Sequence, residues 1–224
     1  MSIGAYLGRF GKEHEEFEED KEYQKWVEHS KKVILKAIQR QTRKKIKWEE
    51  GLQPDQQIGQ TLGSWANLMQ LQIYAAYVNF EGKSPDKPAE DEELDIDKYL
   101  IKYRETMENE SSWEYKNLGF KHLIMTGDEI YYVPFDFPEP LLIEEKDNGK
   151  EIKSISSSYQ LYKELEELNK YLLLVGDYGQ LGEEEAWRFY ENDEDQWRFV
   201  KWVWIVLHWL ARESINKRLC IYFE

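Results

Sequence analysis

Residues 196–216 read QWRFVKWVWIVLHWLARESIN, and their central part is apolar at nearly every position. The exceptions are Arg198, Lys201, His208 and Arg212, whose spacing of 3, 7 and 4 residues places them on one narrow stripe of an α-helix. Exposed apolar surface costs about 25 cal/mol per Å², so the other faces must be covered by the rest of the protein. Residues 199–211 are too short for a membrane span and include Lys201 and His208. The stretch therefore predicts a central buried helix.

The sequence on either side of this helix predicts an α+β fold. Apolar residues recur at helical spacing in five further segments. The first begins near residue 21 and is ended by Gly51 to Pro54, and the others span 64–80, 96–107, 157–173 and 183–196. Two hairpins are expected where apolar runs flank turn residues, namely 120–125 with 130–135 and 141–145 with 151–155. Short strands are expected at 3–10 and at 218–223, the latter pairing with the hairpins. Because helices and hairpins are segregated along the chain, we expect an antiparallel or mixed sheet.

We expect residues 1–224 to form a single α+β domain. Residues 1–50 would be a helical arm packed on it, and residues 82–95, which contain two prolines and many acidic residues, an exposed acidic loop. The one cysteine excludes an internal disulfide, and residues 1–16 lack the apolar core of a signal peptide. A cytoplasmic location is the resulting prediction. Cys220, between Leu219 and Ile221, is expected to be a buried apolar filler.

Charge is distributed unevenly along the chain, which carries a net charge of −14. Residues 31–47 hold eight basic residues and no acidic one. Helical spacing places Lys32, Lys36, Arg40, Arg43 and Lys47 on one face. This basic face either clasps the protein's own carboxylates or binds an external anion. The abundance of acidic residues favours the internal clasp.

No catalytic or metal-binding motif is present. The four histidines stand outside every zinc-ligand spacing, and nucleophile-elbow, phosphate-loop and dinucleotide fingerprints are absent. We therefore expect the protein to bind no cofactor and no metal, and the sequence favours a protein that is not an enzyme. His208 is predicted to be satisfied by a buried carboxylate or a backbone carbonyl.

Two hairpins followed by a helix, over residues 120–173, resemble the latter half of SUKH-type immunity proteins, although no specific motif accompanies the resemblance. The resemblance assigns no residue a role.

The leading functional hypothesis is a non-catalytic protein-interaction module, an acidic inhibitor or immunity-type protein that neutralises a basic partner such as a nuclease toxin or defence effector. The motivating features are the net charge, the clustered acids and the abundance of Trp and Tyr, which anchor interfaces when exposed. General nucleic-acid binding and membrane binding are not expected. The predicted partner-binding residues are Trp187, Tyr190, Glu191, Asp193, Glu194 and Asp195.

Two alternatives stay open. The first is an enzyme or binding protein for a small anionic ligand, with a site around Arg198, Lys201, His208 and Arg212. The second is a basic module in which residues 32–47 contact nucleic acid or an acidic protein.

Overall fold

The structure is a computed structural model that describes residues 2–11, 21–54, 57–125, 130–143, 154–174 and 189–224. The chain divides into two compact units. The first comprises Met1–Ile3, Thr61–Ile124 and Tyr162–Trp209, and the second Gly4–Gln60, Met125–Leu161 and Leu210–Glu224. The α+β class predicted from the sequence is confirmed. The single-domain organisation stays a prediction.

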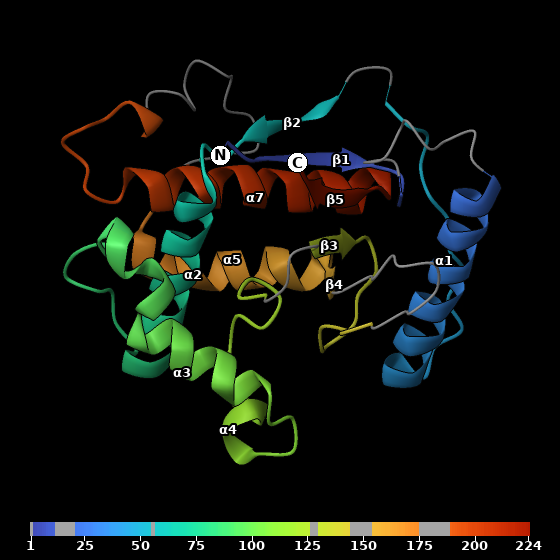
Figure 1. The fold of residues 1–224 in the computed structure, drawn as a ribbon, viewed down its shortest axis with the longest axis horizontal. Coiled ribbons are helices and arrows are strands. Elements are labelled where there is room, and N and C mark those ends of the chain that lie inside the picture. The colour runs from blue at the N-terminus through green and yellow to red at the C-terminus, as the bar shows by residue number, and fades with distance from the viewer. Residues whose placement is uncertain (1, 12–20, 55–56, 126–129, 144–153, 175–188) are drawn as a thin grey trace. The chain divides into compact units, whose positions relative to one another are not determined.

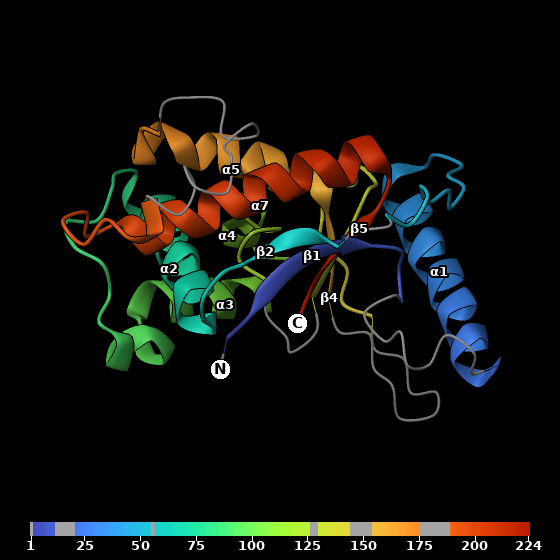
Figure 2. The same cartoon turned by 90° about the horizontal axis from the view of Figure 1, so that it is seen from above.

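The second unit contains a five-stranded sheet in the order β2-β1-β5-β3-β4 (Figure 2). The strands are β1 (Gly4–Gly8), β2 (Ile58–Thr61, whose last residue belongs to the first unit), β3 (Ile130–Val133), β4 (Ser154–Ser157) and β5 (Cys220–Phe223). β5 pairs antiparallel with both β1 and β3, while β3 and β4 run parallel, so the sheet is mixed as expected. The predicted C-terminal strand is confirmed at the centre of the sheet, whereas β2 was not predicted.

The two predicted hairpins are not confirmed. Residues 120–124 form a turn in which the N–H groups of Leu123 and Ile124 donate to the carbonyl of Phe120, at 3.2 and 2.8 Å. Residues 121–125 are all buried, whereas a strand at one face of a core would bury alternate residues. Leu141 makes one antiparallel bridge with Ile155, and β4 otherwise pairs with β3. Both expected turns, at 126–129 and 148–149, lie outside the described residues.

Helix α1 (Lys21–Thr42) belongs to the second unit. Its buried side chains recur at helical spacing, as the sequence predicted: Tyr23, Val27, Ser30, Ile34 and Ile38. The apolar ones join the core cluster that β3, β4 and β5 contribute to. Cys220 is part of this cluster and 1% exposed, which confirms its role as an apolar filler. The opposite face of α1 is therefore left to solvent.

The first unit is built on helices (Figure 1). They are α2 (Trp65–Glu81), the 3₁₀ helix η2 (Asp91–Ile96), α3 (Lys98–Met107), α4 (Trp113–Lys116) and most of α5 (Ser158–Leu172). The Ser64 hydroxyl caps α2 by accepting from the N–H of Asn67, and Gly82 ends it with a left-handed φ of 65°. The Asp97 carboxylate caps α3 in the same way as Ser64 caps α2.

Helix α7 (Arg198–Lys217) confirms the predicted central buried helix. Trp202 and Trp204, in the first unit, are the largest fully buried side chains described. Each indole N–H has a carbonyl acceptor, Thr61 at 3.0 Å and Leu165 at 2.8 Å respectively. The helix predicted at 183–196 falls largely outside the described residues, and residues 191–197 form turns. Within the described ranges, no helix is both long enough and apolar enough to span a membrane.

Candidate functional site

The two most N-terminal cations of the α7 stripe are held by acidic residues just before the helix. Arg198 forms an ion pair with Asp193. Lys201 Nζ lies 2.5 Å from Asp195 Oδ2, and Asp195 Oδ1 also accepts the backbone N–H of Trp197 at 2.9 Å. Two residues of the predicted anion site are thus neutralised by two residues of the predicted partner site.

His208 is enclosed by aromatic rings and a carboxylate. Its ring stacks on Trp204 and on Tyr162, with centroid distances of 4.5 and 4.7 Å. His208 Nε2 lies 2.5 Å from Glu166 Oε1. The pairing with a carboxylate follows the sequence prediction, except that Glu166 is half exposed.

Arg212 completes the stripe, in the second unit, with its Nε 4.0 Å from Glu213 Oε1. In the described part of the chain, every basic side chain of the stripe therefore has a carboxylate within 4.0 Å. An anionic ligand would have to compete with these carboxylates, which weakens the case for the alternative site around Arg198, Lys201, His208 and Arg212.

An exposed acidic segment lies on the first unit. Residues 90–97 read EDEELDID, with six acidic and no basic residues. Leu94 is buried and fastens η2 to α2 and α3, while the side chains of Glu92, Glu93 and Asp95 are exposed. The carbonyl of Ala89 accepts the Gln70 side-chain N–H at 2.5 Å. The helix is thus held by its one large buried apolar residue and presents its carboxylates to solvent.

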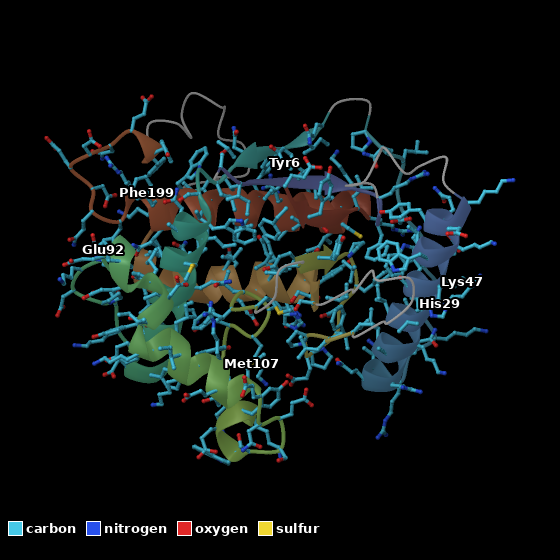
Figure 3. The ribbon with its side chains drawn as sticks, in the orientation of Figure 1. Tyr6, His29, Lys47, Glu92, Met107 and Phe199 are labelled. Carbon is cyan, nitrogen blue, oxygen red and sulfur yellow. The ribbon has the colours of Figure 1, made fainter. Side chains whose placement is uncertain are left out.

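A second acidic run, residues 191–195, lies next to the acidic segment at residues 90–97, although about a hundred residues separate the two in sequence. Gln196 Nε2 donates to the carbonyl of Asp86 at 3.4 Å, and Figure 1 shows η2 and the segment before α7 at the same end of the first unit. Figure 3 labels Glu92 and Phe199 at this end. We define the acidic surface by its exposed acids: Asp86, Glu90, Glu92, Glu93, Asp95, Glu191 and Glu194.

The acidic surface resembles a polyanion in its density of charge. A 3₁₀ helix rises about 2.0 Å per residue, so the carboxylates at 92, 93 and 95 follow one another every ~2–4 Å along its axis. Duplex DNA carries one phosphate charge per ~1.7 Å of axis, or ~3.4 Å on each strand. Along the axis of η2 the carboxylates are therefore spaced about as closely as the phosphates of one DNA strand.

A family model described as "Putative DNA-mimic protein" matches residues 4–223. The chain belongs to this family. No curated protein and no solved structure matches the chain. Membership in the DNA-mimic family supports a protein-interaction role for an acidic chain, as the sequence predicted.

Membership in the DNA-mimic family also corrects the expected partner. The sequence predicted an unidentified basic protein and set nucleic-acid recognition aside. The prediction is wrong in setting nucleic-acid recognition aside, because mimicry of DNA implies a partner that binds DNA. A basic protein as the partner agrees with the family. The family description gives no support to an immunity-type role.

The predicted partner-binding residues divide into two groups. Glu191 and Glu194 are exposed on the acidic surface. Tyr190 is half-buried and packs edge-on against Phe199 and Trp202, at 5.5 and 5.8 Å. Trp187 lies outside the described residues, and Asp193 and Asp195 are paired as described above.

Sequence reasoning missed two exposed apolar residues of the first unit. Ile96, the last residue of η2, is 68% exposed and directly follows the acidic run. Trp113, at the start of α4, is 74% exposed. The only sign of their exposure in the sequence was that each is surrounded by acidic and polar residues and belongs to no clear series of apolar residues at helical spacing.

A different carboxylate of the first unit is structural. Glu164 on α5 accepts the backbone N–H groups of His122 at 3.0 Å and Leu123 at 2.8 Å, and so holds the turn at 120–124. Although the residue as a whole is half-buried, desolvation of its carboxyl raises the pKa of Glu164 to about 8. The N–H donors and the charge of Lys121 oppose this rise.

The raised pKa of Glu164 predicts a pH dependence of stability. Between its ordinary value of 4.5 and about 8, Glu164 keeps its proton in the folded chain and loses it in the unfolded chain, so stability falls as pH rises through this window. Glu164→Gln cannot titrate and lacks this contribution. Urea melts should therefore show the stability of the variant, relative to the unaltered protein, increasing through the window and levelling above it. If the relative stability instead stays constant through this window and the variant loses relative stability as pH rises toward 4.5, the N–H donors outweigh desolvation and hold the carboxylate ionised.

Proposed function

We propose that this protein inhibits a DNA-binding protein by occupying its DNA-contacting surface with the acidic surface of the first unit. The observation that carries the proposal is that exposed acidic runs from two distant parts of the sequence adjoin, in a chain of the DNA-mimic family. Glu92, Glu93, Glu191 and Glu194 would take the place of phosphates in contacts with the arginine and lysine side chains of the partner.

The electrostatics of the chain support rapid capture of such a partner. Complementary charge raises association rates by about 10–10³-fold, and the effect falls as salt increases. The net charge of the whole chain, −14, adds to the attraction of a basic partner at low ionic strength. At a physiological Debye length of about 8 Å, the local carboxylates dominate.

Apolar contacts would add specificity to this attraction. Charges alone bind any basic surface, whereas protein interfaces owe much of their affinity to a few desolvated apolar or aromatic anchors. Ile96 directly follows the row of carboxylates and is 68% exposed. It is the described residue best placed to serve as such an anchor, and its replacement by Ser should weaken binding of the partner without altering the salt dependence.

Competition by DNA tests the proposal. The immobilised full chain is exposed to a lysate of its source organism, and retained proteins are eluted with duplex DNA or with inorganic polyphosphate at equal phosphate concentration and ionic strength. A DNA mimic should release its partner to duplex DNA more readily than to polyphosphate, because the partner recognises the shape of DNA as well as its charge.

The partner released by DNA then provides the second half of the test. The free chain should displace that partner from labelled duplex DNA, since both would occupy the same surface. The proposal fails if the retained proteins resist elution by duplex DNA, or if the eluted partner binds DNA and the chain together.

A further inference from the structure

The basic face of α1 is exposed, and in the described part of the chain most of its cations stand apart from acidic side chains. Lys31, at the edge of the face, is paired with Glu50 at 2.8 Å and Glu28 at 3.9 Å. Among the described residues, no carboxylate lies within 4.0 Å of the exposed side chains of Lys32, Lys36, Arg40, Arg43 or Lys47. Figure 3 labels His29 on α1 and Lys47 alongside that helix. Because α1 ends at Thr42 and Arg43 has a left-handed φ of 56°, Arg43 and Lys47 follow the helix rather than extend its face as the sequence predicted. Within the described ranges, the internal clasp favoured from the sequence is limited to the contacts of Lys31.

The spacing of these cations suits a phosphodiester backbone. Lys32, Lys36 and Arg40 follow one another every four residues, which is about 6 Å along the helix axis at 1.5 Å per residue. Charges on one strand of duplex DNA recur every ~3.4 Å of axis, so successive cations can meet every second phosphate. Arg40 and Arg43 can each bind a phosphate through two parallel N–H donors.

The chemistry of the face favours nucleic acid over an acidic protein. Protein interfaces carry aromatic or aliphatic anchors at their centre, whereas contacts to the phosphate backbone need none. The large exposed apolar residues of the described chain include none on α1; Trp26 and Val33 are packed against the core cluster. The nearest in sequence is Leu52, ten residues beyond the end of the helix.

The net charge of −14 does not cancel this local attraction. At physiological salt the Debye length is about 8 Å, so charges farther than this from the face are largely screened. Residues 31–47 carry eight basic and no acidic residues. We infer that the basic face of α1 binds the sugar–phosphate backbone of nucleic acid without reading its sequence. This inference is independent of the proposed inhibitor function, because α1 and the acidic surface share no residue.

Fluorescence anisotropy with a labelled duplex tests the inference. The full chain is titrated into duplex DNA of about 20 base pairs and duplex RNA of the same length, at salt concentrations from about 50 to 200 mM. The double variant Lys36→Ala/Arg40→Ala removes two phosphate-binding side chains and should lower the affinity at low salt at least about tenfold. It should also reduce the slope of log K against log salt by about 1.8, since each neutralised phosphate contributes about 0.9 to that slope.

The matched control is Lys83→Ala/Lys116→Ala. Both lysines are exposed in the first unit and their replacement changes the net charge by the same amount, so the control should bind as the unaltered protein does. Equal affinity for the two duplexes would show that the face recognises the phosphates that DNA and RNA share. Higher affinity for one duplex would show which nucleic acid the face prefers, and either outcome supports the inference. Circular dichroism melts establish that all variants are folded.

Three results would overturn the inference. One is the absence of binding to either duplex at the lowest salt. The next is an equal loss of affinity in the two double variants, which would reflect net charge alone. The last is salt-sensitive self-association without nucleic-acid binding, abolished in Lys36→Ala/Arg40→Ala, which would make the basic face an interface with the carboxylates of a second copy.

Discussion

Replacing Trp204 with alanine is expected to lower the free energy of unfolding by about 3–5 kcal/mol, the usual cost of emptying a large aromatic site in a core. The Trp204 side chain is 1% exposed and stacks on His208 with a centroid distance of 4.5 Å. Its indole N–H donates to the Leu165 carbonyl at 2.8 Å, so the variant also leaves a buried carbonyl without this donor. Urea melts of the two proteins measure the difference.

Two other tryptophans calibrate this result. Trp113 is 74% exposed, and Trp113→Ala should change the free energy of unfolding by no more than about 0.5 kcal/mol. Trp209 is half-buried, so its replacement should cost less than that of Trp204. A change below about 1 kcal/mol for Trp204→Ala would mean that α7 is not the core of the protein.

The helices could be predicted because their signals are local. The apolar run of α7, the 3.6-residue stripe of α1 and the Ser64 cap of α2 each lie within one segment of sequence. α2 and α7 form within a few residues of their predicted bounds, whereas α1 ends at Thr42, well before the stop predicted at Gly51–Pro54. The central strand β5 was also recognisable, as a short apolar run. Burial of these elements follows from composition alone, since a helix such as α7 can only be stable inside the protein.

The strand pairing could not be predicted because it depends on distant residues. The run at 120–125 was predicted to be one strand of a hairpin, yet the Glu164 carboxylate, about forty residues later, accepts N–H groups of this run and holds residues 120–124 as a turn. β4 pairs parallel with β3 rather than with the run at 141–145, and β2 contributes only four half-buried residues. None of these contacts produces a periodic pattern of apolar and polar residues in the segments that make them.

The acidic surface was visible in the sequence as two separate charge runs. Their juxtaposition depends on the contact between Gln196 and the Asp86 backbone, which no local pattern encodes. The sequence also could not show that Asp193 and Asp195 are paired with Arg198 and Lys201. Neutralising those two aspartates would disturb the start of α7, so they are unsuitable for a test of partner binding.

We expect the largest effect on function from neutralising residues of the acidic surface that form no ion pair with any other described residue. The variant Glu92→Gln/Glu93→Gln/Glu191→Gln/Glu194→Gln removes four exposed carboxylates and raises the net charge from −14 to −10. Because carboxylates on a rim act mainly on the association rate, binding of the captured DNA-binding partner should slow by about 10–100-fold at low salt. Surface plasmon resonance at several salt concentrations measures the rate.

A control variant separates the acidic surface from net charge. It replaces four exposed glutamates on α3, on α4 and in the connection between them by glutamine and produces the same net charge: Glu105, Glu108, Glu110 and Glu114. If position matters, this control should keep most of the association rate, and the difference between the two variants should shrink as salt rises, because screening acts on both. Equal slowing of association in the two variants would show that the partner responds to total charge, and the acidic surface would then have no special part in mimicking DNA.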